Sequence, residues 1–188
     1  MGIFSKMLAV SIAMVLFSGV VLAQEAVKAV PGAALLVYSI SETVRPLPDA
    51  EPITAIVDNS TDFSKRNLSK NAETKKFVDQ KLFLVWKGYI AIPKAGRYTF
   101  SMSYNVAVKN LNNTILQING RDFLGISQLK DPLKFNDSKS LLLGKGDYEI
   151  TIIHRSSHYG GDFSIRMWQT SNPLKKFMIT PAAMVHAE

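Results

Sequence analysis

A run of alternating apolar and polar side chains between Arg97 and Val108 is the feature that most constrains the fold. Large apolar side chains stand at every second position, beginning with Tyr98 and Phe100, and polar side chains stand between them. A period of two is typical of a β-strand with one buried face, whereas a helix repeats about every 3.6 residues. The run therefore predicts a half-buried strand.

Other short apolar runs follow the same logic and are separated by turn residues. Such runs occupy Leu82 to Trp86, Tyr89 to Ile92, Ile115 to Ile118, Leu141 to Leu143, Tyr148 to His154 and Phe163 to Met167. Turns are indicated at Lys94-Ala95-Gly96, Asn119-Gly120 and Gly144-Lys145-Gly146. Gly88 is expected to allow a turn or a close backbone approach. Repeated short strands joined by Gly, Asn and Pro turns predict an all-β fold, an antiparallel, jelly-roll-like β-sandwich.

The segments outside these strands are more polar or richer in proline. Leu35 to Ile40 is a candidate strand, and the proline-rich stretch after it is expected at an edge or in a connection. We expect Asp58 to Lys76 to form an exposed loop, with a short helix near Ala72 to Val78. Asp131 to Ser140 is expected to be a polar loop, and Ile179-Thr180-Pro181 to begin a terminal turn or short helix.

Residues Met1 to Ala23 have the pattern of a cleavable signal peptide. Lys6 provides the positive start, an apolar stretch follows, and Val21-Leu22-Ala23 is a small-residue cleavage pattern. The alternative is a transmembrane anchor, but the apolar length falls short of the roughly 20 residues that a spanning helix needs. We therefore expect a secreted or periplasmic product with no membrane span after cleavage.

Length and composition favour one domain. We expect a signal peptide over residues 1–23, an N-terminal lead and loop over 24–76 that contributes one or two strands, and a β-sandwich core over 77–188. The chain has no cysteine, so apolar burial alone must hold the fold. Its formal charge is +7, or +6 once Lys6 has left, which favours anionic partners. No basic run interleaved with aromatic residues indicates nucleic acid.

Catalytic and metal-binding patterns are weak in this sequence. No nucleophile elbow or phosphate-binding glycine loop occurs, and the acidic residues are spread over turns, so the sequence predicts no catalytic residue and no enzyme. His154, His158 and Asp162 are of metal-ligand type, but a spacing of four residues has no fixed geometry across a strand and a loop. We expect no metal and no cofactor.

Five short motifs occur in the order of one known family. They are Trp86-Lys87-Gly88-Tyr89-Ile90 with Ile92-Pro93; Gly96-Arg97-Tyr98-Thr99-Phe100; Leu116 to Gly120; Leu143-Gly144 with Gly146 and Tyr148-Glu149-Ile150; and Gly160-Gly161 with Trp168. Together they resemble the β-sandwich domain family named after the fourteen-kilodalton fragment of anthrax protective antigen. The resemblance covers roughly residues 77–181 and leaves the lead unmatched.

The resemblance implies binding rather than catalysis, because such domains commonly act as carbohydrate-binding modules attached to glycosidases, adhesins, toxins and flocculins. Lectin members of the family hold calcium with two consecutive aspartates just after the strand that corresponds to Tyr98 to Ser103. This chain has Tyr104-Asn105-Val106 in that neighbourhood. Calcium prefers several oxygen ligands that include carboxylates, so the sequence does not predict calcium by that route.

Aromatic residues near strand ends are the candidate binding groups. A ring at such a place can stack on a sugar, while amide, basic and acidic neighbours supply hydrogen bonds. The predicted ligand-binding residues, called here the loop-end set, are Tyr104, Asn105, Lys109, His158, Tyr159 and Asp162. Trp168 is expected to serve packing more than binding.

Two functional hypotheses remain open from the sequence. The first is an exported, non-catalytic module that recognises a glycan or an anionic cell-surface component through loops at one end of the sandwich. The second is a structural or assembly subunit of a bacterial surface machine, such as a pilus or secretion complex. In that case the lead over 27–52 would contact a protein partner, by adding a strand to its sheet.

Overall fold

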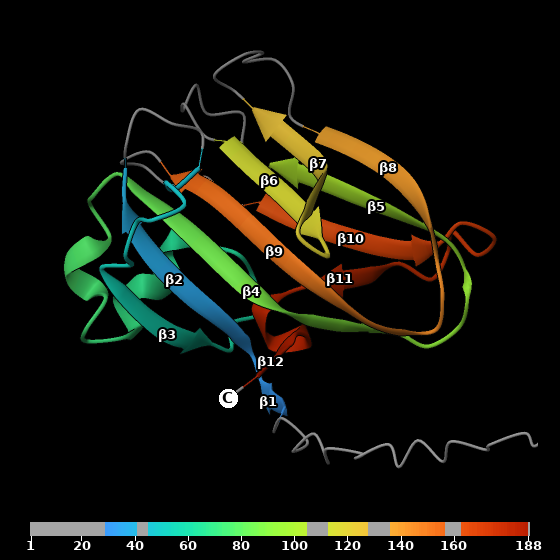
Figure 1. Cartoon of the computed structure of the whole chain (residues 1–188), viewed down its shortest axis with the longest axis horizontal. Helices are drawn as coiled ribbons and strands as arrows, with labels where there is room; N and C mark the ends of the chain where they lie inside the picture. The colour runs from blue at the N-terminus through green and yellow to red at the C-terminus, as the bar shows by residue number, and fades with distance from the viewer. Residues whose placement is uncertain (1–28, 41–44, 105–112, 128–135, 157–162, 188) are drawn as a thin grey trace, which may run out of the picture.

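The computed structural model describes residues 29–40, 45–104, 113–127, 136–156 and 163–187, and these form two antiparallel sheets. The larger, eight-stranded sheet has the order β1-β12-β4-β9-β6-β7, with β2 paired to β4 and to β3; the smaller has the order β11-β10-β5-β8 (Figure 1). No α-helix occurs in the described residues. The predicted all-β antiparallel sandwich is therefore confirmed.

The strand bounds follow the chain from the lead to the C-terminus. The larger sheet contains β1 (Ala29–Pro31), β2 (Ala33–Ser39), β3 (Thr54–Asp58), β4 (Leu82–Ile92), β6 (Asn113–Ile118), β7 (Arg121–Ser127), β9 (Gly146–Ser156) and β12 (Val185–Ala187). The smaller contains β5 (Gly96–Tyr104), β8 (Asn136–Leu143), β10 (Phe163–Gln169) and β11 (Phe177–Ile179). Three short 3₁₀ helices complete it, η1 (Lys65–Lys70), η2 (Lys75–Phe77) and η3 (Pro181–Ala183).

Alternation in β5 places one set of side chains in the core between the sheets. Tyr98, Phe100, Met102 and Tyr104 are buried, while the residues between them lie on the outer face of the smaller sheet. This confirms the period-two prediction as far as Tyr104; Val106 and Val108 lie outside the described residues. The same inward set recurs in β10, where Phe163, Ile165 and Met167 are buried.

In β4 both faces are covered, which explains its continuous apolar run. Leu82, Leu84 and Trp86 join the main core, whereas Phe83 and Val85 belong to a second buried cluster on the outer face of the larger sheet. Gly88 marks the point at which β2 stops pairing with β4 and β12 begins. A Cβ there would lie 2.8 Å from the Val185 carbonyl oxygen, so the close backbone approach expected of this glycine is present.

The Asn119-Gly120 turn joins β6 to β7 as the sequence indicates. Both residues have positive φ, 49° and 73°, which is the requirement of a tight two-residue hairpin turn. The Asn119 side chain also accepts a hydrogen bond from the Glu149 backbone N–H, at 3.0 Å. The turn is therefore anchored to the neighbouring strand β9.

The lead is built into the larger sheet. β2 pairs with β4 on one edge and with β3 on the other, and the proline-rich stretch connects β2 to β3. Leu35 and Val37 are fully buried in the main core. Three strands of the larger sheet, β1, β2 and β3, therefore come from a region without a family resemblance.

The expectation of an exposed loop over Asp58 to Lys76 is wrong in part. The segment contains η1 and ends with η2 close to the helix expected near Ala72 to Val78, but Phe63 and Leu68 are each only 1% exposed. Phe63 stacks on Phe163 with ring centroids 5.2 Å apart and meets Trp86 edge to face at the same distance. Two buried apolar side chains thus attach an otherwise largely exposed segment to the core.

The expectation of a polar loop over Asp131 to Ser140 also needs correction. Residues 136–140 belong to β8, which pairs with β5 along its length, and 131–135 lie outside the described residues. β8 is an edge strand whose outer face carries polar side chains, so its sequence lacks the apolar alternation of a core strand. At the C-terminus, Thr180 caps η3 by accepting from the Ala183 N–H, which confirms the expected short terminal helix.

Candidate functional site

Of the predicted loop-end set, only Tyr104 lies within the described residues; Asn105, Lys109, His158, Tyr159 and Asp162 do not. Tyr104 ends β5 and is 8% exposed. Its hydroxyl shares a 2.8 Å hydrogen bond with the Thr114 hydroxyl, which in turn contacts Nδ1 of His154 at 2.8 Å. Burial raises the pKa of Tyr104, and the hydrogen bond to Thr114 opposes that shift in part.

This chain of three polar groups ties together β5, β6 and β9 at one end of the sandwich. His154 is 1% exposed and packs on Phe163, with ring centroids 4.9 Å apart. Tyr104 is therefore a buried residue at the end of β5, below the surface of this end of the sandwich. Its role in ligand binding, with that of the rest of the loop-end set, stays a prediction.

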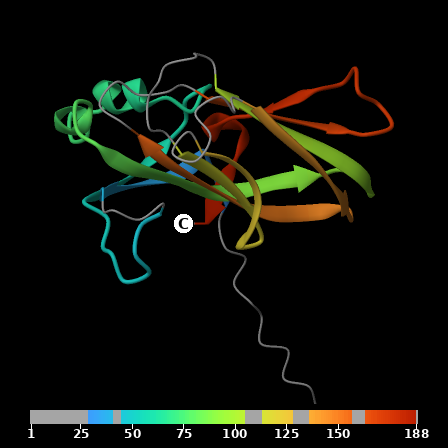
Figure 2. The ribbon, with the colours of Figure 1, turned by 90° about the horizontal axis from the view of Figure 1, so that it is seen from above.

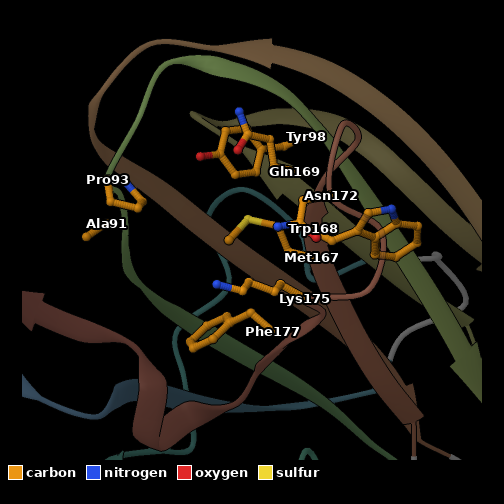
Figure 3. Close-up of a pocket in the computed structure, with 9 residues that line it drawn as sticks. All are labelled: Ala91, Pro93, Tyr98, Met167, Trp168, Gln169, Asn172, Lys175 and Phe177. Carbon is orange, nitrogen blue, oxygen red and sulfur yellow. The ribbon is translucent and has the colours of Figure 1, made fainter.

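The opposite end of the molecule holds an open cleft of about 300 Å³. In Figure 2 the β4–β5 turn and the β10–β11 hairpin lie at this end of the molecule, opposite to η1 and η2. Residues from the end of β4, the start of β5, and the β10–β11 hairpin line it (Figure 3). They are Ala91, Pro93, Tyr98, Met167, Trp168, Gln169, Asn172, Lys175 and Phe177.

Local hydrogen bonds fix both walls of this cleft. On one side, β4 stops at Ile92, and the Tyr98 hydroxyl donates to the Lys94 carbonyl at 2.7 Å, which holds the β4–β5 turn. On the other side, the Asn172 N–H donates to the Gln169 carbonyl at 2.8 Å, and the Thr170 N–H donates to the Arg97 carbonyl at 2.8 Å. The first bond closes the turn after β10, and the second attaches the hairpin to β5.

The side chains in the cleft combine apolar surface with amides and one cation. Met167, Lys175 and Phe177 point from the hairpin toward Ala91 and Pro93, whereas the Trp168 indole turns away (Figure 3). Phe177 is 49% exposed, so its ring is available to a ligand. Among the described residues that line the cleft none is acidic, which suits it to neutral or anionic ligands.

A second hollow of about 520 Å³ lies at the other edge of the same end, between β7 and β8. Its one acidic side chain, Asp122, accepts from Arg45 at 2.7 Å and from Gln117 at 2.8 Å. These bonds commit the carboxylate to the protein. The Asp122 carboxylate is therefore less available to a ligand than the polar groups of the cleft are.

Metal and membrane-spanning features are limited to what the described residues contain. Among them, no group of three or more His, Cys, Asp or Glu residues could hold a metal ion. Of the His154, His158 and Asp162 cluster, only His154 falls in the described ranges. No helix in the described part of the chain is long and apolar enough to cross a membrane.

No family model matches the chain, and no curated protein sequence matches it. Solved structures share its fold. A PA14 domain of the antifreeze protein MpAFP has a TM-score of 0.57 at 13% identity, covering 85% of this chain and 92% of that one. A PA14 sugar-binding domain from an RTX adhesin has a TM-score of 0.53 at 10% identity, covering 84% and 99%.

A β-glucosidase from Kluyveromyces marxianus, solved with glucose, contains a similar region with a TM-score of 0.53 and 16% identity. The match covers 74% of this chain but only 17% of the β-glucosidase, so the likeness concerns one part of that enzyme. At these identities the comparisons establish the fold alone. Solved PA14 domains share the all-β fold of this chain, and no family model assigns the chain to that family.

The cleft itself was missed by sequence reasoning. Tyr98 and Met167 read as core residues, and Asn172, Lys175 and Phe177 follow the last clear strand, where no motif drew attention to them. The available signal was one aromatic residue beside two lysines, Lys175-Lys176-Phe177, in a short segment after Trp168. Only the pairing of β11 with β10 brings that segment against the end of β4.

Proposed function

We propose that this chain is an exported, non-catalytic module that binds a glycan or an anionic cell-surface component. The observation that carries the proposal is the cleft at the β4–β5 end, which is lined by the Phe177 ring, the Asn172 amide and the Lys175 side chain and by no acidic residue among those described. An aromatic ring packs against the apolar face of a sugar, and amide and ammonium groups bind its hydroxyl or acidic substituents.

Two further facts support this assignment. The fold is that of PA14 domains, one of which is a sugar-binding domain of an RTX adhesin. The formal charge of +7 favours anionic partners by attracting them at long range. Export is proposed from the signal-peptide pattern over Met1 to Ala23.

A glycan array probed with the mature chain tests the proposal. Asn172→Ala and Phe177→Ala remove groups from the hairpin side of the cleft, where exposed positions tolerate truncation. We expect each variant to weaken binding of a positive glycan about tenfold, while Lys70→Ala, an exposed lysine on η1, leaves it unchanged. Binding to no glycan or acidic polymer would end the proposal.

The same array compares the two ends of the sandwich. Tyr159→Ala removes a ring of the predicted loop-end set. If Tyr159→Ala abolishes binding and the cleft variants do not, the ligand site belongs to the loop end. Loss in the cleft variants alone assigns it to the cleft.

An assembly role is the second candidate, and one observation favours a specific form of it. β3 pairs only with β2 among the described strands, and Ile53 and Val57 beside its open edge are 43% and 47% exposed. Such an edge can accept a strand from a partner. β2 itself is bonded on both edges, so the lead is poorly placed to donate a strand. Ala55→Pro would block pairing at β3, and loss of a co-purifying envelope protein would support this role.

A further inference from the structure

The outer face of the smaller sheet has an unusual composition. Its positions alternate with the core residues of β5, β8 and β10, and the strand registers align them in rows across the sheet. We call these residues the hydroxyl face. They are Arg97, Thr99, Ser101 and Ser103 on β5; Asn136, Ser138, Ser140 and Leu142 on β8; Ser164, Arg166 and Trp168 on β10; and Met178 on β11.

Serine and threonine dominate the centre of this face, where they are held by one another. Thr99 shares hydrogen bonds with Ser140 at 2.9 Å and with Thr170 at 2.8 Å, and Ser103 shares one with Ser164 at 3.0 Å. A hydroxyl has one donor and two acceptor positions, so each keeps capacity for another partner. Ser164 is only 9% exposed, whereas Ser138 is exposed and Thr99, Ser101, Ser103 and Ser140 are partly exposed. Because neighbouring strands lie about 4.8 Å apart, these accessible hydroxyls are regularly spaced across β5 and β8.

The charge on this face has one sign. Arg97 and Arg166 are exposed, and none of the residues of the hydroxyl face is acidic. Lys176 adds a third cation at the border, with its Nζ 5.0 Å from the centre of the Trp168 ring. Arginine binds carboxylates through two parallel N–H donors, so this surface complements a ligand that carries carboxylates among many hydroxyls.

We propose that the hydroxyl face binds an acidic polysaccharide that lies across the strands of the smaller sheet. This inference rests on the proposed glycan-binding function and adds the substrate class and a second, extended surface. The serine and threonine rows exchange hydrogen bonds with sugar hydroxyls, and Arg97 and Arg166 pair with uronate carboxylates. A cleft of about 300 Å³ accommodates a short part of such a polymer, whereas the open face follows its length.

Polygalacturonate of defined length is a suitable probe, with its methyl-esterified form as the uncharged counterpart and poly-glutamate as an anion without sugar. The test variant is Arg97→Gln with Arg166→Gln. Its control is Lys87→Gln with Lys145→Gln, which removes the same charge from exposed positions on the larger sheet and the β8–β9 turn. Ser101→Leu is a third variant, which covers the central row without changing charge.

We expect polygalacturonate to bind more tightly than its methyl ester or poly-glutamate, as measured by titration calorimetry. The arginine variant should weaken that binding about tenfold, Ser101→Leu should weaken it several-fold, and the lysine control should change it less than about twofold. Thermal unfolding midpoints near that of the wild type would show that each variant is folded.

Three outcomes would overturn the inference. Equal loss in the arginine and lysine variants would mean that only net charge matters, and equal binding of poly-glutamate would mean that no sugar is recognised. Loss of polygalacturonate binding in Asn172→Ala but not in the arginine variant would leave the proposed function standing and place the ligand in the cleft alone. Absence of binding to any glycan would remove the proposed function as well.

Discussion

The two sheets of the sandwich share one core but differ in the side chains on their outer faces. On the larger sheet, Phe83 and Val85 are 0% and 4% exposed and form a second apolar cluster with Ile115 and Ile153. On the smaller sheet, the corresponding positions are the serines, threonines and arginines of the hydroxyl face. The larger sheet is thus buried on both sides around Phe83 and Val85, whereas in the smaller sheet the apolar side chains of β5 lie on the inner side.

This difference decides how each strand reads in the sequence. β4 is continuously apolar over Leu82 to Trp86 because both faces are covered, and β5 alternates because only its inner face is. The same difference determines which sheet has an outer face that a large ligand can contact. The larger sheet has little free outer surface around Phe83, so a large ligand finds polar, accessible sheet surface on the smaller one.

A substitution in the core shared by both sheets should reduce stability more than one on either outer face. Trp86→Ala should have the largest effect. Trp86 is fully buried and packs edge to face against both Phe63 and Phe163, and its Nε1–H donates to the buried Asp58 carboxylate at 2.7 Å. Truncation leaves a cavity and removes that donor. We expect the free energy of unfolding to fall by about 4 kcal/mol, as measured by chemical denaturation. A change below about 1 kcal/mol would contradict this packing.

Phe83→Ala and Ser101→Ala test the outer faces directly. Phe83 is buried on the larger sheet, so its truncation should reduce the free energy of unfolding by about 3 kcal/mol. Ser101 occupies the middle of the hydroxyl face, and its change to Ala should matter by less than about 0.5 kcal/mol. Similar effects from the two variants would show that the two outer faces are not distinct.

Sequence reasoning succeeded where one physical rule dominated. The alternation through Tyr98 and Phe100 required a one-sided strand, and Asn119-Gly120 required positive φ, so both were predictable. Phe63 was not, because a single aromatic in a polar segment has no period, and its burial depends on the distant partners Trp86 and Phe163.

The candidate sites were harder to predict than the strands. The cleft is formed by three segments that are far apart in the sequence, so Lys175 and Phe177 carry no local signal. The hydroxyls of Ser138 and Ser140 read as loop residues because an edge strand with one polar face lacks apolar alternation. A surface built from such strands becomes visible only when the register aligns them with β5.

Substitution of one glycine in each sheet compares how tightly the two sheets are packed. In the larger sheet, a Cβ on Gly88 would meet the Val185 carbonyl oxygen at 2.8 Å and Met184 Cβ at 3.1 Å, which are held by β12 and the turn before it. In the smaller sheet, a Cβ on Gly96 would meet only the end of the Gln169 side chain, at 2.6 Å. Gly88→Ala should therefore lower the free energy of unfolding by about 2 kcal/mol. Gly96→Ala should change it by less than about 0.5 kcal/mol, because Gln169 can rotate away. Thermal melts of both variants decide between this order and its reverse.

The smallest expected effect concerns the ion pair at the edge of the larger sheet, where Arg45 of the β2–β3 loop meets Asp122 of β7. Hydrogen bonds from Gln117 and Arg45 hold the pKa of Asp122 below its ordinary value of 3.8. A carboxylate with a lowered folded-state pKa stabilises the fold above the unfolded value, and that contribution is lost as pH falls below about 4. Both side chains are about half exposed, so the pair should contribute only about 0.5 kcal/mol.

Chemical denaturation of the wild type and of Asp122→Asn at pH 6 and pH 3 measures the contribution of this ion pair to the free energy of unfolding. The difference between them should be present at pH 6 and vanish at pH 3, and Arg45→Gln should produce a similar loss that is not additive with it. A difference above about 2 kcal/mol at pH 6 would mean that the ion pair, rather than the apolar cluster around Phe83, fixes the β2–β3 loop against the sheet. A small difference, together with a large effect of Phe83→Ala, assigns that task to apolar burial.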